Sequence, residues 1–150
     1  MTISKSTLIE NTHQEFYTLF NSITGFTGKV YPAYPYLDLD GASTKASYPI
    51  FVLESPDFDT WENFTLNKLR IEGSITLDIY TTSAKTCDEY ASDAFDKIET
   101  SIKTLRALGL EFIELDGMTK DMANKGKLNI HLKTIKWRFK FVFSRTSLPY

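Results

Sequence analysis

The chain has 150 residues, of which 42% are hydrophobic and 24% are charged, and its net charge at pH 7 is −2. This length suits one domain with its own core, and the composition excludes a disordered tail, a collagen-like fibre and a low-complexity linker. The near-neutral charge does not favour a nucleic-acid-binding protein, and we expect a single domain over residues 1–150.

The first expected element is an amphipathic helix near the N-terminus. Thr7 precedes Glu10 by the spacing of a capping box, which predicts that the helix starts there. Gly25 suits its end. Its apolar stripe consists of Leu8, Thr12, Phe16, Leu19, Phe20 and Ile23.

Residues 26–64 alternate between irregular and extended segments. Val30-Tyr31 predicts the start of a short strand. Residues 31–49 hold three prolines and four tyrosines, and a long loop is expected over residues 33–48. Ile50 to Glu54 reads as a buried strand, and Ser55 to Phe64 as an acidic loop.

The middle of the chain gives the clearest pattern. Apolar and polar side chains alternate from Leu69 to Thr81, which predicts a strand with one face in the core. Thr86 has capping-box spacing to Glu89, so a second amphipathic helix is expected from there to Gly109.

The last third predicts two strands and a loop. Leu110 to Leu115 reads as a strand, residues 116–127 as a polar loop, and Leu128 to Arg145 as a long final strand. The sequence therefore predicts an α+β fold, with a largely antiparallel sheet of four or five strands and two main helices mostly on one face.

Catalytic chemistry is not indicated. The chain has one cysteine, Cys87, and two histidines, so it lacks a zinc ligand set, and its glycines form no phosphate-binding loop. Cys87 falls in a helical stripe and is expected to be a small core residue. We expect no cofactor, no metal site, no signal peptide and no membrane span.

Charge is distributed unevenly along the chain. Residues 1–116 carry a net charge of −9, and residues 117–150 carry +7. The final strand could face solvent, bind nucleic acid or meet the acidic segment of a neighbouring copy. The last reading gives candidate subunit-interface residues: Lys133, Lys136, Arg138, Lys140 and Arg145 against Glu54, Asp57, Asp59 and Glu62.

The acidic group around Asp57 and Asp59 has two other readings. It could be a solvated acidic loop, or its carboxylates could serve acid–base chemistry or a hard cation. The two long loops are candidates for contacts with neighbouring subunits or partners. Their candidate contact residues are Tyr34, Tyr36, Asp38, Asp40, Lys120, Asp121, Lys125 and Lys127.

Several short motifs occur in a familiar order. They are Val30-Tyr31-Pro32, Tyr48-Pro49-Ile50, the strand segment from Ile75 to Ser83, and Leu108-Gly109-Leu110, followed by a phenylalanine-rich final strand. This layout, over about residues 5–145, resembles the tail-terminator or tail-completion family of long-tailed bacteriophages and the related head–tail joining proteins.

The resemblance implies a structural virion protein and no enzyme. Such a protein forms a hexameric ring that caps the tail tube, stops its polymerisation and offers a surface for head joining. Its partners are other copies of itself, the tail tube protein and head–tail connector proteins. DNA passes through the lumen without sequence-specific binding, and assembly takes place in the host cytoplasm. Because DNA must slide, we expect the acidic segment, rather than the basic strand, to contribute more of the lumen.

Alternatives remain at this point. A head-side neck protein of the same fold would bind the connector rather than the tube. A non-viral α+β interaction module would be a monomer or dimer. An enzyme would use the acidic group around Asp59.

Overall fold

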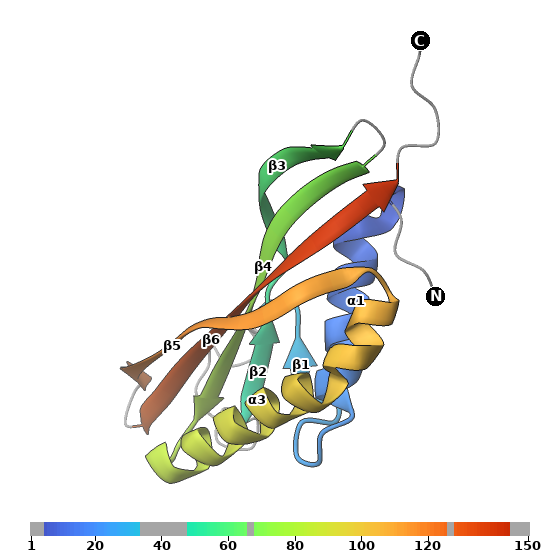
Figure 1. The fold of residues 1–150 in the computed structure, drawn as a ribbon. Helices are drawn as coiled ribbons and strands as arrows, with labels where there is room; N and C mark the ends of the chain where they lie inside the picture. Colours follow the sequence, from blue (N-terminus) through green and yellow to red (C-terminus); the bar gives the residue numbers. More distant parts are fainter. Residues whose placement is uncertain (1–4, 34–47, 66–67, 126–127, 145–150) are drawn as a thin grey trace.

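The computed structural model describes residues 5–33, 48–65, 68–125 and 128–144. Within these ranges the chain forms a single sheet and two α-helices, as expected for an α+β fold (Figure 1). The elements are η1 (Lys5–Thr7), α1 (Leu8–Asn21), β1 (Val30–Tyr31), β2 (Ile50–Leu53), β3 (Asp57–Thr65), β4 (Lys68–Thr81), α3 (Ala84–Ala107), β5 (Leu110–Lys125) and β6 (Leu128–Ser144).

The sheet has six strands rather than the expected four or five. Their order is β1-β2-β4-β6-β5, and β3 pairs with β4 beyond the end of β2. β1 and β2 are parallel, and every other pair is antiparallel. The additional strand is β3, which occupies the segment that the sequence predicted to be an acidic loop.

Strands β4 and β6 form the centre of the sheet. They pair without a register shift from Lys68 opposite Ser144 to Thr81 opposite His131. The expected alternation of β4 is confirmed, since Ile71, Ile75 and other apolar residues on one face are buried. This central pair fixes which side chains of the neighbouring strands reach the core.

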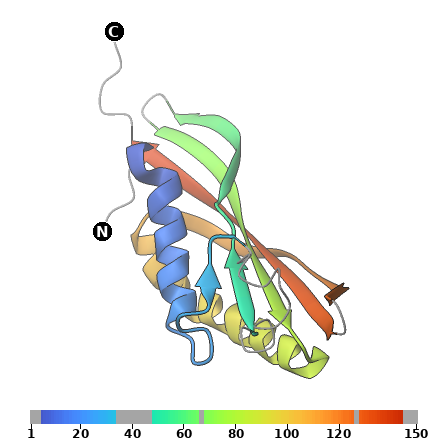
Figure 2. The ribbon, with the colours of Figure 1, turned by 180° about the vertical axis from the view of Figure 1, so that it is seen from behind.

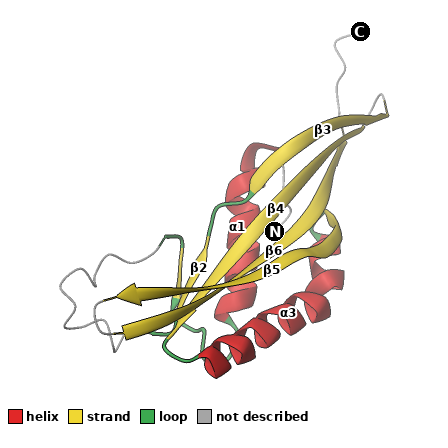
Figure 3. Cartoon of the chain, turned by 90° about the vertical axis from the view of Figure 1, so that its left-hand side faces the viewer, coloured by secondary structure: helices red, strands yellow, loops and turns green. Residues whose placement is uncertain are grey.

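Both helices cover the same face of the sheet (Figure 3). Phe16 and Phe20 of α1 lie against β6, with ring centroids 5.9 Å from Phe139 and 5.6 Å from Trp137. Figure 2 shows α1 running beside β1. The expected apolar stripe of the first helix is therefore confirmed as a core face at Leu8, Thr12, Phe16 and Phe20.

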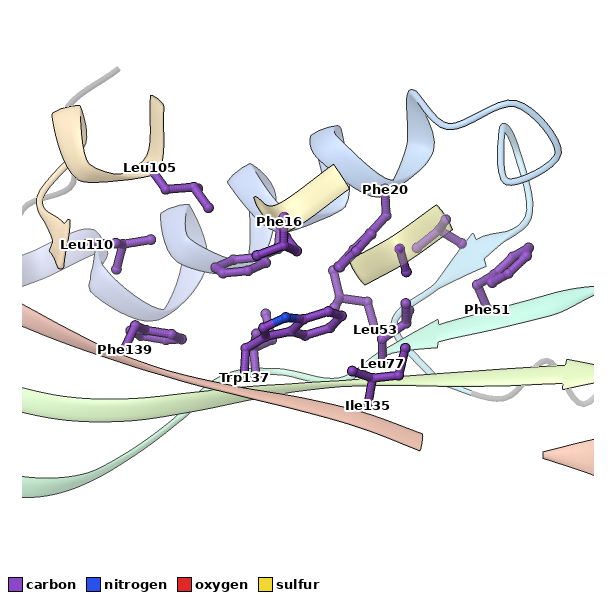
Figure 4. Packing of buried hydrophobic residues seen from close by; sticks show 14 of the residues in the cluster. Phe16, Phe20, Phe51, Leu53, Leu77, Leu105, Leu110, Ile135, Trp137 and Phe139 are labelled. Atoms are coloured by element: carbon purple, nitrogen blue, oxygen red, sulfur yellow. The ribbon is translucent and has the colours of Figure 1, made fainter. Parts of the chain in front are cut away.

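Large side chains fill the space between the layers (Figure 4). Trp137 and the phenylalanines around it are fully buried. A second aromatic group lies near the chain reversal after α1, where Phe26 stacks on Phe51 at 3.7 Å and both meet the edge of Tyr90. Aromatic pairs in these geometries stabilise a core beyond their area alone.

The helix boundaries only partly follow the capping boxes. Thr7 occupies the N-cap position of α1, but its side chain makes no capping hydrogen bond. α3 begins at Ala84, before Thr86, because Ser83 with its extended backbone is the N-cap. Gly109 follows the C-cap at a φ of +110°, where its amide donates to the carbonyl of Arg106, as expected for a helix end.

Two segments expected to be loops are strands. Asp57–Thr65 forms β3 against β4, and the polar residues 116–125 continue β5 along β6. In both cases a long central strand offers backbone groups that need partners, and this pairing outweighs the polar composition of the segment. Most of the expected loop 33–48 lies outside the described residues.

Candidate functional site

The predicted basic residues of the final strand lie mainly on the sheet face opposite the helices. Lys136, Arg138 and Lys140 stand in register with Thr76, Ser74 and Glu72 of β4. Each basic group has an acidic neighbour from the same chain. The ion pairs are Arg138 with Asp59 (3.5 Å) and Glu72 (3.7 Å), Lys140 with Glu72 (3.4 Å), and Lys136 with Asp116 (3.7 Å).

These ion pairs reduce the uncompensated positive charge that the basic face offers to a partner. Its charge is balanced by carboxylates of β3, β4 and β5, so a neighbouring copy is not needed to neutralise it. Exposed pairs of this kind stabilise a fold by about 0–1 kcal/mol each. Whether the basic strand also forms a subunit interface stays a prediction.

Lys133 does not belong to this basic face. Its Nζ lies 2.5 Å from Oδ1 of Asp88, a residue of α3, so its side chain is on the helix side of the sheet. The strand period of two explains the correction, because Lys133 shares parity with Ile135 and Trp137. The hydrogen bond from Lys133 holds the pKa of the Asp88 carboxyl below its ordinary value.

The predicted acidic residues near the start of β3 are only partly balanced. Asp59 meets Arg138, whereas Glu54 lies near Asp57 and Asp78. Burial, and then repulsion by these two carboxylates, raises the pKa of Glu54 above its ordinary value. Asp78 also accepts a hydrogen bond of 2.7 Å from the Thr134 hydroxyl.

The apolar side chains left exposed gather on β5. Phe112 is 66% exposed, Met122 is 58% exposed, and Leu115 and Met118 are each 40% exposed. Phe112 has a φ of 53°, unusual for a bulky residue, within a register shift between Glu111 and Glu114. Its ring lies 5.2 Å from Nζ of Lys140.

A shallow groove separates β5 from α3. Its volume is about 500 Å³, and Ala91, Phe95, Leu115 and Met118 contribute its apolar walls. Asp88 and Lys133 also line it. An exposed apolar strip beside a groove is typical of a surface that contacts another protein.

A second hollow, of about 370 Å³, lies near the start of α3 and includes Cys87 and His131 among its walls. Cys87 is buried, and burial raises the pKa of its thiol above the ordinary value. Its Sγ donates to the carbonyls of Ile79 and His131 at 3.6 Å and 3.8 Å. A neutral, shielded thiol is a poor nucleophile, so the expectation that Cys87 is a core residue is confirmed.

His13 and the metal-ligating side chains complete the description of the site. His13 is engaged through Nε2 with the carbonyl of Leu53 at 2.9 Å. Among the described residues no group of three metal-ligating side chains comes together. In the same part of the chain, neither helix has the length and apolar character needed to cross a membrane.

The expected contact residues divide into three sets. Lys120 and Asp121 lie on β5 and are exposed, and Asp121 accepts a 2.7 Å hydrogen bond from the Met122 amide. Glu62 and Lys125 belong to β3 and β5, but their side chains are outside the described part. Outside the described residues altogether are Tyr34, Tyr36, Asp38, Asp40, Lys127 and Arg145.

Comparison with known proteins adds no family assignment. No protein-family model matches this chain, and the search of curated proteins gives no match either.

The exposed apolar residues of β5 were missed by sequence reasoning. Met118 and Met122 stand within a polar stretch, which hides their common face. The length of β6 could have indicated that residues 116–125 form a strand. A strand of 17 residues leaves many backbone groups unpaired unless each neighbouring strand has a similar length.

Proposed function

We propose that this chain is a structural protein that assembles with copies of itself into a ring on the end of a phage tail tube. In this role it would stop tube polymerisation and provide the surface for head joining in the virion. The proposal involves no catalysis and no cofactor. It accounts for a domain whose most distinctive surface is apolar and extended rather than concave and polar.

The observation that supports the proposal is the composition of the β5 edge. Among the described residues, six large hydrophobic side chains are exposed, and four of them lie on β5. β5 pairs with β6 on one side and with no described strand on the other. An apolar edge of this kind promotes association of chains unless another protein covers it.

The charged sheet face suits a wall along which DNA moves. Carboxylates of β3, β4 and β5 offset Lys136, Arg138 and Lys140, so these three cations do not form a row of uncompensated charge along the described part of this face. Phosphate contacts from unpaired lysine and arginine would hold DNA in place. We therefore propose that this face, rather than the helix side, lines the lumen.

The first test is the solution mass by light scattering over a range of concentrations, together with negative-stain imaging. The second is cosedimentation with purified tail tubes. Ring-shaped particles that bind one end of the tube are expected. Binding to head connectors without tube binding would favour a head-side neck protein. A monomer that binds neither would contradict the proposal and favour a non-viral interaction module.

A further inference from the structure

We propose that the outer edge of β5 in one copy docks against β3 and the hollow beside it in the next copy, with Met118, Lys120 and Met122 facing the hollow. This inference rests on the proposed ring and names the two surfaces that would join its subunits. The contact is between unlike surfaces, so it repeats from copy to copy and closes into a ring when the rotation allows.

The docking part of β5 is its second half. Register shifts interrupt β5 near Glu111 and Leu115, but pairing with β6 is regular from Gly117 to Lys125. Met118 stands opposite Ile135, and Lys120 stands opposite Lys133, which contacts α3. Because alternate residues share a face, Met118, Lys120 and Met122 all lie on the helix side of the sheet.

The receiving surface lies on the same side of the sheet at its other edge. A hollow of about 610 Å³ opens between the start of α1 and the start of β3. Its apolar walls include Leu8, Ile9, Pro56 and Phe58, and Ile9 is 54% exposed. Phe58 is also on the helix side, since its ring meets the edge of Phe139 at 5.7 Å. The two unbranched methionines suit an irregular apolar hollow of this kind.

Charge complementarity favours a second copy as the occupant. Glu10 and Asp57 line the hollow, and both side chains are exposed. The regular stretch of β5 carries two lysines and one aspartate. Lys120 makes no ion pair with any described residue, and it lies between the two methionines in sequence. Docking would place this lysine beside Glu10 and Asp57, which form no ion pair with another described residue. Such complementarity fixes orientation more than affinity.

The two surfaces cannot meet within one chain. The β5–β6 hairpin and the start of α1 lie at opposite ends of the molecule in both Figure 1 and Figure 2. Between β3 and β5 stand β4 and β6, so the lateral separation alone is roughly 14 Å at the usual strand spacing. A lysine side chain does not span that distance, so any contact must come from another copy.

A charge-exchange experiment tests the inference. The first variant is Lys120→Glu, and the second combines Glu10→Lys with Asp57→Lys. Each variant alone has two docking surfaces of the same sign, so the concentration for half-assembly should rise by at least about tenfold. An equimolar mixture should restore assembly, because each variant then meets the opposite charge on its neighbour.

Controls separate docking from folding. Lys103→Glu makes the same change in charge as Lys120→Glu at an exposed position of α3 and should leave assembly at the wild-type concentration. Circular dichroism melting checks that each variant is folded. A further variant, Met118→Ser with Met122→Ser, should also weaken assembly, and no charge exchange should rescue it.

The outcomes distinguish this inference from the proposed function. Rings that form and bind tubes equally well in all charge variants would overturn the docking surfaces and leave the ring standing. Charge-sensitive assembly without tube binding would support the surfaces and contradict the tail role. A wild-type chain that stays monomeric, free and with tubes, would overturn both and show that the lysines keep the edge from pairing.

Discussion

The neighbouring strands β6 and β5 differ in their number of partner strands, in the regularity of their register and in the burial of their apolar side chains. β6 has a strand on each side, alternates regularly and buries Trp137 and Phe139. Among the described residues, β5 has a strand on one side only, contains two register shifts and exposes four large apolar side chains. The contrast shows that the number of neighbouring strands, and not composition alone, decides how regular the register of a strand is and how fully its apolar side chains are buried.

The largest expected difference concerns side-chain truncation in the two strands. Trp137 is 0% exposed, so Trp137→Ala should lower the free energy of unfolding by about 3–5 kcal/mol. Met122→Ala on β5 should change it by less than about 0.5 kcal/mol. Urea denaturation of both variants measures this difference. Similar losses would mean that β5 is covered in the free protein.

Glycine substitutions sharpen the comparison between centre and edge. A Cβ at Gly73 of β4 would come within 2.7 Å of the Phe58 ring and 2.9 Å of the Asp57 carbonyl. Gly73→Ala should therefore destabilise the fold by about 1–3 kcal/mol. At Gly117 of β5 nothing lies within 4 Å, so Gly117→Ala should be nearly neutral. Thermal melting of the pair is the measurement, and a larger loss at Gly117 would reverse the interpretation.

Removal of a charged side chain should also destabilise the fold more on the central strand β4 than on the edge strand β5, but by less than the substitutions above. Glu72 of β4 contacts both Arg138 and Lys140, so Glu72→Gln should lower stability by up to about 1 kcal/mol at low salt. The loss should shrink as salt screens the pairs. Lys120→Gln on the β5 edge should leave the stability of the monomer unchanged. Denaturation at two salt concentrations tests both, and a salt-independent loss at Glu72 would contradict the ionic explanation.

The smallest expected effect is the pH dependence of stability that Glu54, next to β4, contributes. The pKa of Glu54 is raised in the folded state, so folding favours its protonated form. Its stabilising contribution is present below the ordinary pKa of a glutamate and is lost as pH rises through the raised folded value. Glu54→Gln should therefore flatten stability across that window and slightly raise it at pH 7. Glu99→Gln, on the exposed side of α3, is the control and should change neither.

Sequence patterns predicted the central strands and the two helices, which each bury one apolar face. The alternation of Leu69–Thr81 and of the final strand, and the stripes of both helices, reflect burial on one face, which composition records directly. The α+β class followed from these elements. The residues of β3 and of the second half of β5 are polar because one edge meets solvent, and polar composition resembles that of a loop.

The candidate site was predictable in charge but not in geometry. The basic residues of the final strand were identified, yet their partners Glu72 and Asp116 depend on strand order, which a single sequence does not specify. Lys133 was grouped with the basic residues of the final strand because of its charge, although its position in the alternation puts it on the helix side of the sheet. The exposure of Phe112 and of the β5 methionines could not be predicted from the sequence, because it depends on the position of β5 at the edge of the sheet.

Cys87 has a practical consequence for experiments on this molecule. It is the single cysteine of the chain, it is buried, and its thiol stays neutral at physiological pH. Maleimide dyes and spin labels react with exposed thiolates, so they should leave the native protein unmodified. A cysteine introduced at a surface position can then carry a probe without removal of the native residue. Energy transfer between such probes would then measure distances between copies in the proposed ring, in an otherwise unaltered chain.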